Sequence, residues 1–391
     1  MNCKTVLLKD LVLGEKGSYG IGAPAVDYDP KKYTYLRITD INDDGSINTN
    51  GLKSVDAEDA YKYILQENDI VFARTGASTG KTYFYQPQDG TLVYAGFLIK
   101  FSIDPRKVNP RLLKYITHSQ EYYDWVRSFD TGGTRGNINA VTFANMPITL
   151  PNRATQDKIV AILSSLDDKI ELNRRINANL EQQAQALYKS WFVDFEPFGG
   201  KMPEDWREGT LGEICTELKE KVHDRDDVKV LSPVATGQLM LSEEFFTKQV
   251  YSKSIAKYIV VPQNCFAYNP ARVNIGSLGM NEFDFDGCVS PVYVVFRCQN
   301  GYEYFFDLFR HTKPFKEEVK LRAIGGVRQT LSYDDFARIQ INIPTYNVIQ
   351  YFNKIYLTNL DVRWHNQYEI LRLAHLRDTL LPKLMSGEIT I

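Results

Sequence analysis

The chain has 391 residues, which is long for a single domain and predicts two or three compact units. Apolar residues make up 43% of it and charged residues 24%, as in a folded globular protein and not a disordered one. The net charge of −2 argues against a protein that coats nucleic acid through bulk electrostatics, and no apolar run reaches the length of a membrane span. We therefore expect a cytoplasmic protein with no membrane partner.

The first part of the chain mixes aromatic-rich strands with short helices. Strands are expected at residues 33–38 and 69–74 and a helix at residues 110–128. An alternating strand follows from Met146 to Pro151, where a proline closes it. This pattern predicts an α/β module that ends in a strand.

A long internal repeat determines the architecture. The sequence Gly-Gly-x-Arg occurs at residues 132–135 and again at residues 325–328, an offset of 193. Phe143 and Pro151 recur at the same offset. In both copies an alternating strand, the second at residues 339–344, leads into a helix, which predicts two modules of the same kind.

The helices after these strands have the spacing of a coiled-coil seam. A first helix over residues 152–192 would be roughly 60 Å long at about 1.5 Å per residue, too long for one small domain to bury, so its simplest partner is its own repeat copy. At an offset of 194, the seam positions of the first helix continue with the same spacing in the second helix, and Gln367 stands at the repeat position of Asn173. The predicted seam is Leu163, Leu166, Ile170, Asn173, Leu180 and Leu187 with Leu357, Leu360, Trp364, Gln367 and Leu371.

The predicted organisation is therefore module, long helix, module, long helix. The segments are residues 1–151, 152–195, 196–344 and 345–391, with a Pro- and Gly-rich connector after the first helix. The fold class is α/β modules plus long α-helices, in which an antiparallel coiled coil of two helices separates the modules in a pseudo-twofold repeat.

Motifs that would carry catalysis do not meet the requirements of their chemistry. Residues 76–82 resemble a phosphate-binding loop but have three residues between the glycines instead of four, and a strand follows instead of a helix. The acid-x-Lys triplet at residues 318–320 is common on helix surfaces, and residues 268–271 lack the second proline and the aromatic of an amino-methyltransferase motif. Five cysteines without a C-x-x-C pair and five scattered histidines predict free thiols and no metal site. We expect no catalytic residues.

Several segments in this order resemble the specificity subunits of type I restriction-modification enzymes, over essentially the whole chain. They are residues 131–139, 146–159, 187–195, 202–206 and 376–389. The resemblance implies two target recognition domains that each contact one half of a split sequence in double-stranded DNA, with the paired helices as a ruler between the halves. It also implies two methyltransferase subunits that bind S-adenosylmethionine and methylate adenine, and restriction subunits that use ATP and Mg. This chain would bind no cofactor, would be non-catalytic and would serve phage defence.

Loop placement and side-chain chemistry identify candidate DNA contacts. Arg can read guanine and Asn adenine through paired hydrogen bonds, whereas Lys and Ser mostly hold phosphate. The candidates are Arg74, Ser78, Lys81, Thr134, Arg135 and Asn137 in the first module and Arg272, Asn274, Arg322 and Arg328 in the second. The alternative is that these loops are turns whose arginines make structural salt bridges.

Two alternative functions make different demands on the sequence. A single-chain nuclease or methyltransferase would need a catalytic segment, for which the repeats leave no room. A coiled-coil scaffold that binds no DNA would explain the helices, but not two diverged modules with matching Gly-Gly-x-Arg loops.

Overall fold

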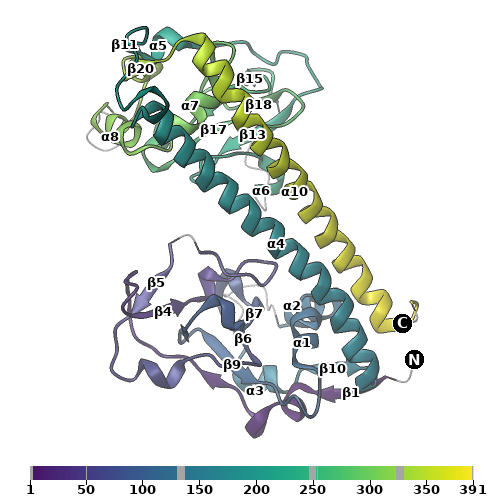
Figure 1. The fold of residues 1–391 in the computed structure, drawn as a ribbon. Helices are drawn as coiled ribbons and strands as arrows, with labels where there is room; N and C mark the ends of the chain where they lie inside the picture. The colour runs from purple at the N-terminus through teal and green to yellow at the C-terminus, as the bar shows by residue number, and fades with distance from the viewer. Residues whose placement is uncertain are drawn as a thin grey trace. The chain divides into compact units, whose positions relative to one another are not determined.

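The computed structural model describes residues 3–49, 51–129, 137–245, 252, 254–322, 330–389 and 391. Their contacts divide the chain into two units: unit 1 is Met1–Asn173 with Tyr368–Ile391, and unit 2 is Arg174–Gln367. Each unit contains one α/β module and parts of the two long helices α4 and α10 (Figure 1).

Unit 1 is built on two four-stranded sheets and a strand pair. The pair joins β1 (Lys4–Leu7) to β10 (Pro147–Leu150), so the first and last strands of the module are hydrogen-bonded neighbours. One sheet has the order β2-β9-β6-β7, which are Ser18–Tyr19, Leu98–Ser102, Asp69–Ala73 and Thr82–Phe84. The other has the order β3-β5-β4-β8, which are Ala25–Asp27, Lys53–Val55, Tyr33–Leu36 and Leu92–Tyr94.

The helices of this module begin at polar caps. The expected helix at residues 110–128 is two helices, α1 (Pro110–Ile116) and α2 (Gln120–Arg127), because the Ser119 side chain caps the second by accepting from the Tyr122 amide. A third helix, α3, is Ala140–Ala144. Short 3-10 helices are η1 (Leu8–Leu11), η2 (Leu13–Glu15), η3 (Ile38–Asp40), η4 (Ala60–Tyr63), η5 (Gly76–Ser78) and η6 (Pro87–Asp89).

Unit 2 repeats this plan with different side chains. Its strand pair is β11 (Arg207–Thr210) with β20 (Gln340–Ile343). Its sheets are β12-β19-β16-β17 (Cys215–Leu218, Val294–Cys298, Phe266–Tyr268, Leu278–Met280) and β14-β13-β18-β15 (Leu239–Leu241, Lys229–Pro233, Gly287–Val289, Ile259–Val261). Its short helices are α5 (Leu211–Ile214), α6 (Ser242–Phe245), α7 (Glu303–Phe309), α8 (Lys313–Arg322), α9 (Tyr333–Ala337), η7 (Glu196–Phe198) and η8 (Val273–Ile275).

The topology confirms the internal repeat. In both units a sheet contains one parallel neighbour pair, β4 with β8 in unit 1 and β13 with β18 in unit 2. The repeat landmarks Phe143 and Phe336 are both fully buried. The strand before each long helix alternates exposed and buried residues, as predicted for β10 and β20.

Aromatic packing supplies much of each core. In unit 1 the Phe72 ring contacts Phe101 and Phe143 at centroid distances of 5.6 and 4.8 Å. In unit 2 Phe296 and Phe336 lie 4.7 Å apart. Truncating one such ring to alanine costs about 3–5 kcal/mol, so these contacts are a main source of each module's stability.

The two long helices form as expected and pair antiparallel. Helix α4 is Arg153–Phe192 and helix α10 is Tyr346–Ser386 (Figure 1). In unit 1, Ile170 of α4 packs with Ile370 and Leu373 of α10. In unit 2, Asn366 Nδ2 donates to Asn177 Oδ1 at 2.9 Å.

Part of the predicted seam on the second helix was wrong. Trp364 and Leu371 are 45% and 62% exposed, and Gln367 is exposed as well. The reason is that the helices keep the 193 offset of the other repeat landmarks instead of 194, so that Asn366 takes the repeat position of Asn173. Of the other predicted seam residues, Leu163, Ile170, Asn173 and Leu360 are buried, and Leu166, Leu180, Leu187 and Leu357 are partly buried.

One close approach in unit 1 requires glycine. Gly45 has a φ of +74°, and a Cβ built there would lie 2.6 Å from Cε1 of the His118 ring. Burial lowers the pKa of His118, whose Nδ1 contacts the Lys114 carbonyl oxygen at 2.7 Å. The glycine lets the loop after η3 close over a neutral histidine.

The cysteines are free thiols, as predicted. Cys215, Cys265 and Cys288 are buried, whereas Cys3 is exposed. Burial raises the pKa of the Cys265 thiol to about 11, which makes it unreactive at neutral pH.

Candidate nucleic-acid interface

In unit 1 the structure brings together the two segments predicted to contact DNA. Arg74 directly follows β6, and its carbonyl accepts a hydrogen bond from the Ile138 amide at 2.9 Å. Thr75 and Asn137 form an isolated antiparallel bridge beside it. The loop after β6 and the residues Asn137 and Ile138 that follow the Gly-Gly-x-Arg segment are therefore adjacent, although they are more than sixty residues apart in sequence.

The Arg74 side chain lies against two aromatic rings. Its guanidinium carbon is 5.2 Å from the centroid of Tyr19 and 6.0 Å from that of Phe97. The two rings are 43% and 55% exposed. The Arg74 Nε is buried and has no hydrogen-bond partner among the described residues. Neither ring was predicted from the sequence, because no local motif links either of them to Arg74.

The other two candidates in this loop, Ser78 and Lys81, make contacts within the protein. Lys81 Nζ forms an ion pair with Asp43 at 2.8 Å, and its amide donates to the Ser78 carbonyl at 2.9 Å. Strand β7 follows, not a helix, which agrees with the prediction that this is not a phosphate-binding loop. The structural alternative therefore accounts for Lys81, while Ser78 forms part of a turn.

Three candidates lie outside the described residues: Thr134, Arg135 and Arg328. Asn137, the next candidate after the first Gly-Gly-x-Arg segment, is described and exposed.

Unit 2 uses the same backbone connection with different side chains. The Leu331 amide donates to the Pro270 carbonyl at 3.1 Å, which matches the bond between Ile138 and Arg74 in unit 1. Pro270 therefore occupies the position of Arg74. Strand register places Val292, which is 70% exposed, at the position of Phe97, because Val294 pairs with Tyr268 as Ile99 pairs with Phe72.

The candidates of unit 2 differ in their freedom to meet a ligand. Arg272 and Asn274 are exposed at η8, which ends at Gly276 with a φ of +98°. Arg322 donates from Nε to Glu318 at 2.8 Å within α8, as expected for a structural salt bridge. Val319, the middle residue of the acid-x-Lys triplet at residues 318–320, is buried, so this triplet belongs to an ordinary packed helix.

A cavity of about 380 Å³ lies beside η8 and carries several basic side chains. Its lining includes Asn274, Arg310, His311, Lys316 and Lys320. Arg310 is paired with Asp307 at 2.7 Å. Burial lowers the pKa of His311 to about 4, so this histidine is neutral at physiological pH.

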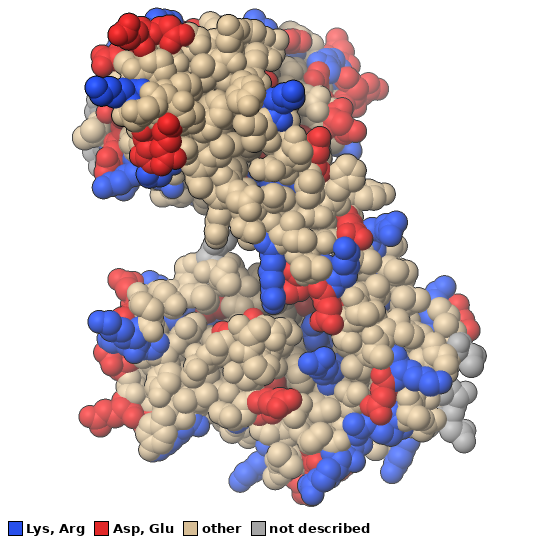
Figure 2. Space-filling model, viewed as in Figure 1, with Lys and Arg blue, Asp and Glu red and all other residues tan. Residues whose placement is uncertain are grey.

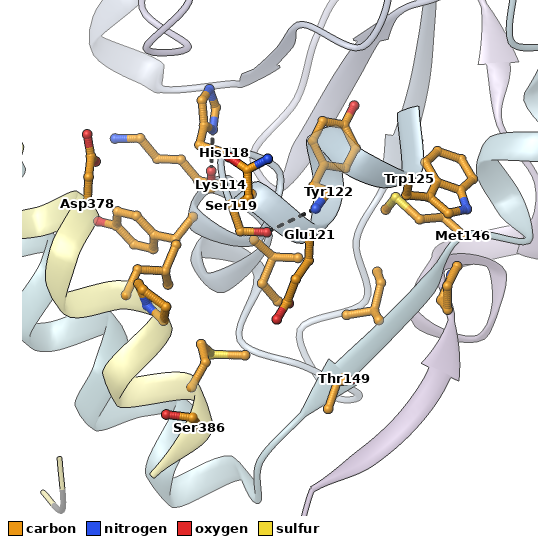
Figure 3. Close-up of a pocket in the computed structure, with 18 of the residues that line it drawn as sticks. Lys114, His118, Ser119, Glu121, Tyr122, Trp125, Met146, Thr149, Asp378 and Ser386 are labelled. Carbon is orange, nitrogen blue, oxygen red and sulfur yellow. Dashed lines mark hydrogen bonds between the residues drawn. The ribbon is translucent and has the colours of Figure 1, made fainter. Parts of the chain in front are cut away.

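A larger cavity of about 600 Å³ in unit 1 lies among α1, α2, β10 and the end of α10 (Figure 3). Beside it Asp167 joins three elements: its carboxylate accepts from Lys114 at 2.6 Å, from Arg377 at 2.9 Å and from the Tyr115 hydroxyl at 3.0 Å. Burial raises the pKa of Asp167, but the two cations outweigh it and the net effect lowers that pKa. Lys114 and Arg377, which line this cavity, are thus both bound by Asp167, which indicates a structural network.

The long helices leave apolar side chains exposed. On α10 in unit 2, Tyr351 is 62%, Ile355 37% and Val362 43% exposed. Their spacing of four and seven residues places them along one face of the helix. Figure 2 shows acidic and basic side chains interspersed on the visible face of each unit, without a large patch of one sign.

Two further features bear on function. Among the described residues there is no group of three or more His, Cys, Asp or Glu side chains that could hold a metal ion. Within the same residues, no helix has both the length and the apolar character needed to cross a membrane.

Comparisons with known proteins agree on one family. The family model described as the type I restriction modification DNA specificity domain matches residues 2–182. The HindI specificity subunit of Haemophilus influenzae is 24% identical over 409 aligned residues, covering 84% of this chain and 88% of that one. The MjaIX specificity subunit of Methanocaldococcus jannaschii is 24% identical, covering 71% and 69%. The crystal structure of a type I S subunit from M. genitalium has the same fold, with a TM-score of 0.56, 16% identity and coverage of 98% and 96%.

Proposed function

We propose, from the premise that this chain belongs to the DNA specificity subunits of type I restriction-modification enzymes, that its two units each read one half of an interrupted DNA sequence. The observation that carries the proposal is the repeated connection after β6 and β16. The same backbone hydrogen bond holds both loops, at Arg74 and at Pro270, but the side chains around it differ. A conserved frame with divergent side chains is what two readers of different base sequences require.

The chain contributes recognition, and its partners contribute chemistry. Two methyltransferase subunits bind S-adenosylmethionine and methylate adenine, while restriction subunits use ATP and Mg. This division is supported by the near-neutral charge of the chain, because partners that close around the duplex can share the neutralisation of phosphates. The chain itself is non-catalytic and acts in the cytoplasm. A scaffold without a DNA role finds no support in the comparisons.

The exposed face of α10 in unit 2 is the proposed contact with a methyltransferase subunit. Tyr351, Ile355 and Val362 present apolar surface, which a partner helix would bury. We expect Ile355→Asp and Val362→Asp together to reduce co-purification with the methyltransferase subunit, since each would bury an unpaired charge. Gln350→Asp, at an exposed position of the same helix that does not line the hollow formed by Tyr351 and Ile355, is the matched control. Equal recovery of the partner with all variants would contradict this contact.

The proposed function is tested by the methylation of genomic DNA. The chain is expressed with its methyltransferase subunit in a host that lacks both, and N6-methyladenine is mapped by long-read sequencing. We expect methylation at one interrupted motif, absent when this chain is omitted. Methylation that is the same with and without the chain would refute the proposal.

A further inference from the structure

Resting on the proposed function, the geometry around Arg74 points to the contact that sets one base of the recognised sequence. We propose that Arg74 reads a guanine in the half-site bound by unit 1, and that unit 2 reads its half-site without an equivalent contact. The inference concerns a single specificity-determining residue and depends on how its side chain is held.

The first step is the placement of the guanidinium. Arg74 lies at the end of β6, where its amide donates to the Phe97 carbonyl at 3.1 Å and its carbonyl accepts from Ile138. The backbone of Arg74 is therefore fixed on both sides by hydrogen bonds, to Phe97 in the turn before β9 and to Ile138 beside the Thr75–Asn137 bridge. A side chain that reads a base must come from such a fixed position, because small displacements abolish paired hydrogen bonds.

The second step is the orientation of the side chain. The guanidinium carbon lies over Tyr19 at 5.2 Å and over Phe97 at 6.0 Å. The Tyr19 hydroxyl is itself held, since it accepts a hydrogen bond from the Ala140 amide at 3.1 Å. Aromatic faces orient the planar guanidinium of arginine in a way that the compact ammonium of lysine does not share.

The third step is the absence of an internal acceptor. Other buried or half-buried arginines of unit 1 have carboxylate partners: Arg37 pairs with Asp40 and Arg377 with Asp167. Among the described residues Arg74 has no ion pair, and its buried Nε has no hydrogen-bond partner. A guanidinium that is oriented by rings and has no acceptor among the described residues is suited to the O6 and N7 acceptors of guanine in the major groove.

The fourth step is the asymmetry of the two units. In unit 2, Pro270 stands at the position of Arg74 and Val292 at the position of Phe97. Unit 2 therefore has neither the guanidinium donors of Arg74 nor the aromatic ring of Phe97 at these positions. The half-site of unit 2 must be read by other residues. The inference therefore predicts that loss of Arg74 changes one half of the motif and leaves the other unchanged.

The test compares Arg74→Lys with wild type in the complex with the methyltransferase subunit. Arg74→Lys keeps the positive charge but loses the paired N–H donors of the guanidinium. We expect the preference for guanine at one position of one half-site to fall between about 5-fold and about 150-fold, the range for one paired contact to a base. Arg106→Lys is the control, because Arg106 is an exposed arginine of the same unit that pairs with Asp104. It should leave the motif unchanged.

A second measurement does not depend on how the variant folds. Binding of the wild-type complex is measured on duplexes in which each guanine of the motif is replaced in turn by 7-deazaguanine, which lacks the N7 acceptor. In the wild-type complex, this replacement at one position of one half-site should weaken binding.

The outcomes separate this inference from the proposed function. If the motif depends on the chain but Arg74→Lys discriminates as wild type does, or lowers binding equally on all sequences as a phosphate contact would, the inference is overturned and the proposed function stands. The inference is also overturned if no 7-deazaguanine in either half-site weakens binding. If methylation does not depend on the chain, both fail.

Discussion

Asp167 offers the strongest single test of the packing in unit 1. It lies on α4 and holds Lys114 of α1 and Arg377 of α10, and the three side chains are only 14%, 21% and 17% exposed. Removing one partner of a fully buried ion pair costs about 3–5 kcal/mol, because the remaining charges lose their compensation. With this partial exposure we expect Asp167→Ala to cost about 2–4 kcal/mol.

Hydrogen exchange read by mass spectrometry measures this loss region by region. A cost of about 3 kcal/mol corresponds to exchange that is roughly 100-fold faster, since each 1.4 kcal/mol is about a factor of ten. The acceleration should appear in the amides of α1 and of the first turns of α4, and not in β16 and β19 of unit 2. In thermal unfolding, a unit of 150–250 residues should lose roughly 4–16 °C.

Asp168→Ala is the matched control, because Asp168 is the exposed neighbour on the same helix. It should change stability by no more than about 0.5 kcal/mol. If Asp167→Ala exchanges at the wild-type rate, or if Asp168→Ala is as damaging, the network is not what ties these three elements together.

The remaining predictions concern a polar layer, a glycine and a histidine. Asn177→Leu or Asn366→Leu should each cost about 1 kcal/mol in urea unfolding, and the double variant less than the sum, because each single change removes the hydrogen bond that joins these two partly buried amides. Gly45→Ala should destabilise unit 1 more than Gly14→Ala, since both glycines have a φ of +74° but only Gly45 faces a histidine ring. Burial lowers the folded-state pKa of His311 to about 4, so its contribution to stability is lost as pH falls below the unfolded value near 6.5, by about 2 kcal/mol at pH 5; urea unfolding of His311→Gln at pH 7 and pH 5 should lack this change.

Each of these has its own refutation. Additive costs for the two asparagines would mean that they act independently. If Gly45→Ala and Gly14→Ala lowered the free energy of unfolding equally, backbone strain alone would explain both costs and the histidine ring would contribute nothing. A wild type whose stability does not fall between pH 7 and pH 5 relative to His311→Gln would show that His311 accepts a proton in the folded state.

The architecture was readable from the sequence because its signals are periodic or repeated. The strand before Pro151 and the long helix after residue 152 each depend on local pattern, and the structure confirms them, whereas the Gly-Gly-x-Arg landmarks lie outside the described residues. The seam on α10 was harder. Trp364 and Leu371 are apolar and fit a heptad, so hydrophobicity alone selected a phase one residue away from the true one. The constant offset of 193 predicts the phase of α10 better than the hydrophobic pattern does, because it relates structurally equivalent positions of the two repeats.

The candidate site was only partly predictable. The sequence predicts Arg74 as a candidate contact, since glycines and a preceding strand mark a loop that can present an arginine. It could not identify Tyr19 and Phe97, because their contact with Arg74 arises from the pairing of β2, β9 and β6. It also could not tell that Lys81 and Arg322 are engaged by Asp43 and Glu318, since ion pairs depend on where side chains meet in the fold.

We propose that each unit reads its own half of the DNA sequence. Replacing the module of unit 2 by the module of unit 1 within the chain tests this proposal. Residues 4–150 are placed in the position of residues 207–343, at boundaries where the same antiparallel strand pair closes each module. The genome of cells expressing this chain with the methyltransferase subunit is then mapped for N6-methyladenine. We expect an interrupted motif whose two halves are both the half-site of unit 1. A motif that keeps the half-site of unit 2 would contradict it.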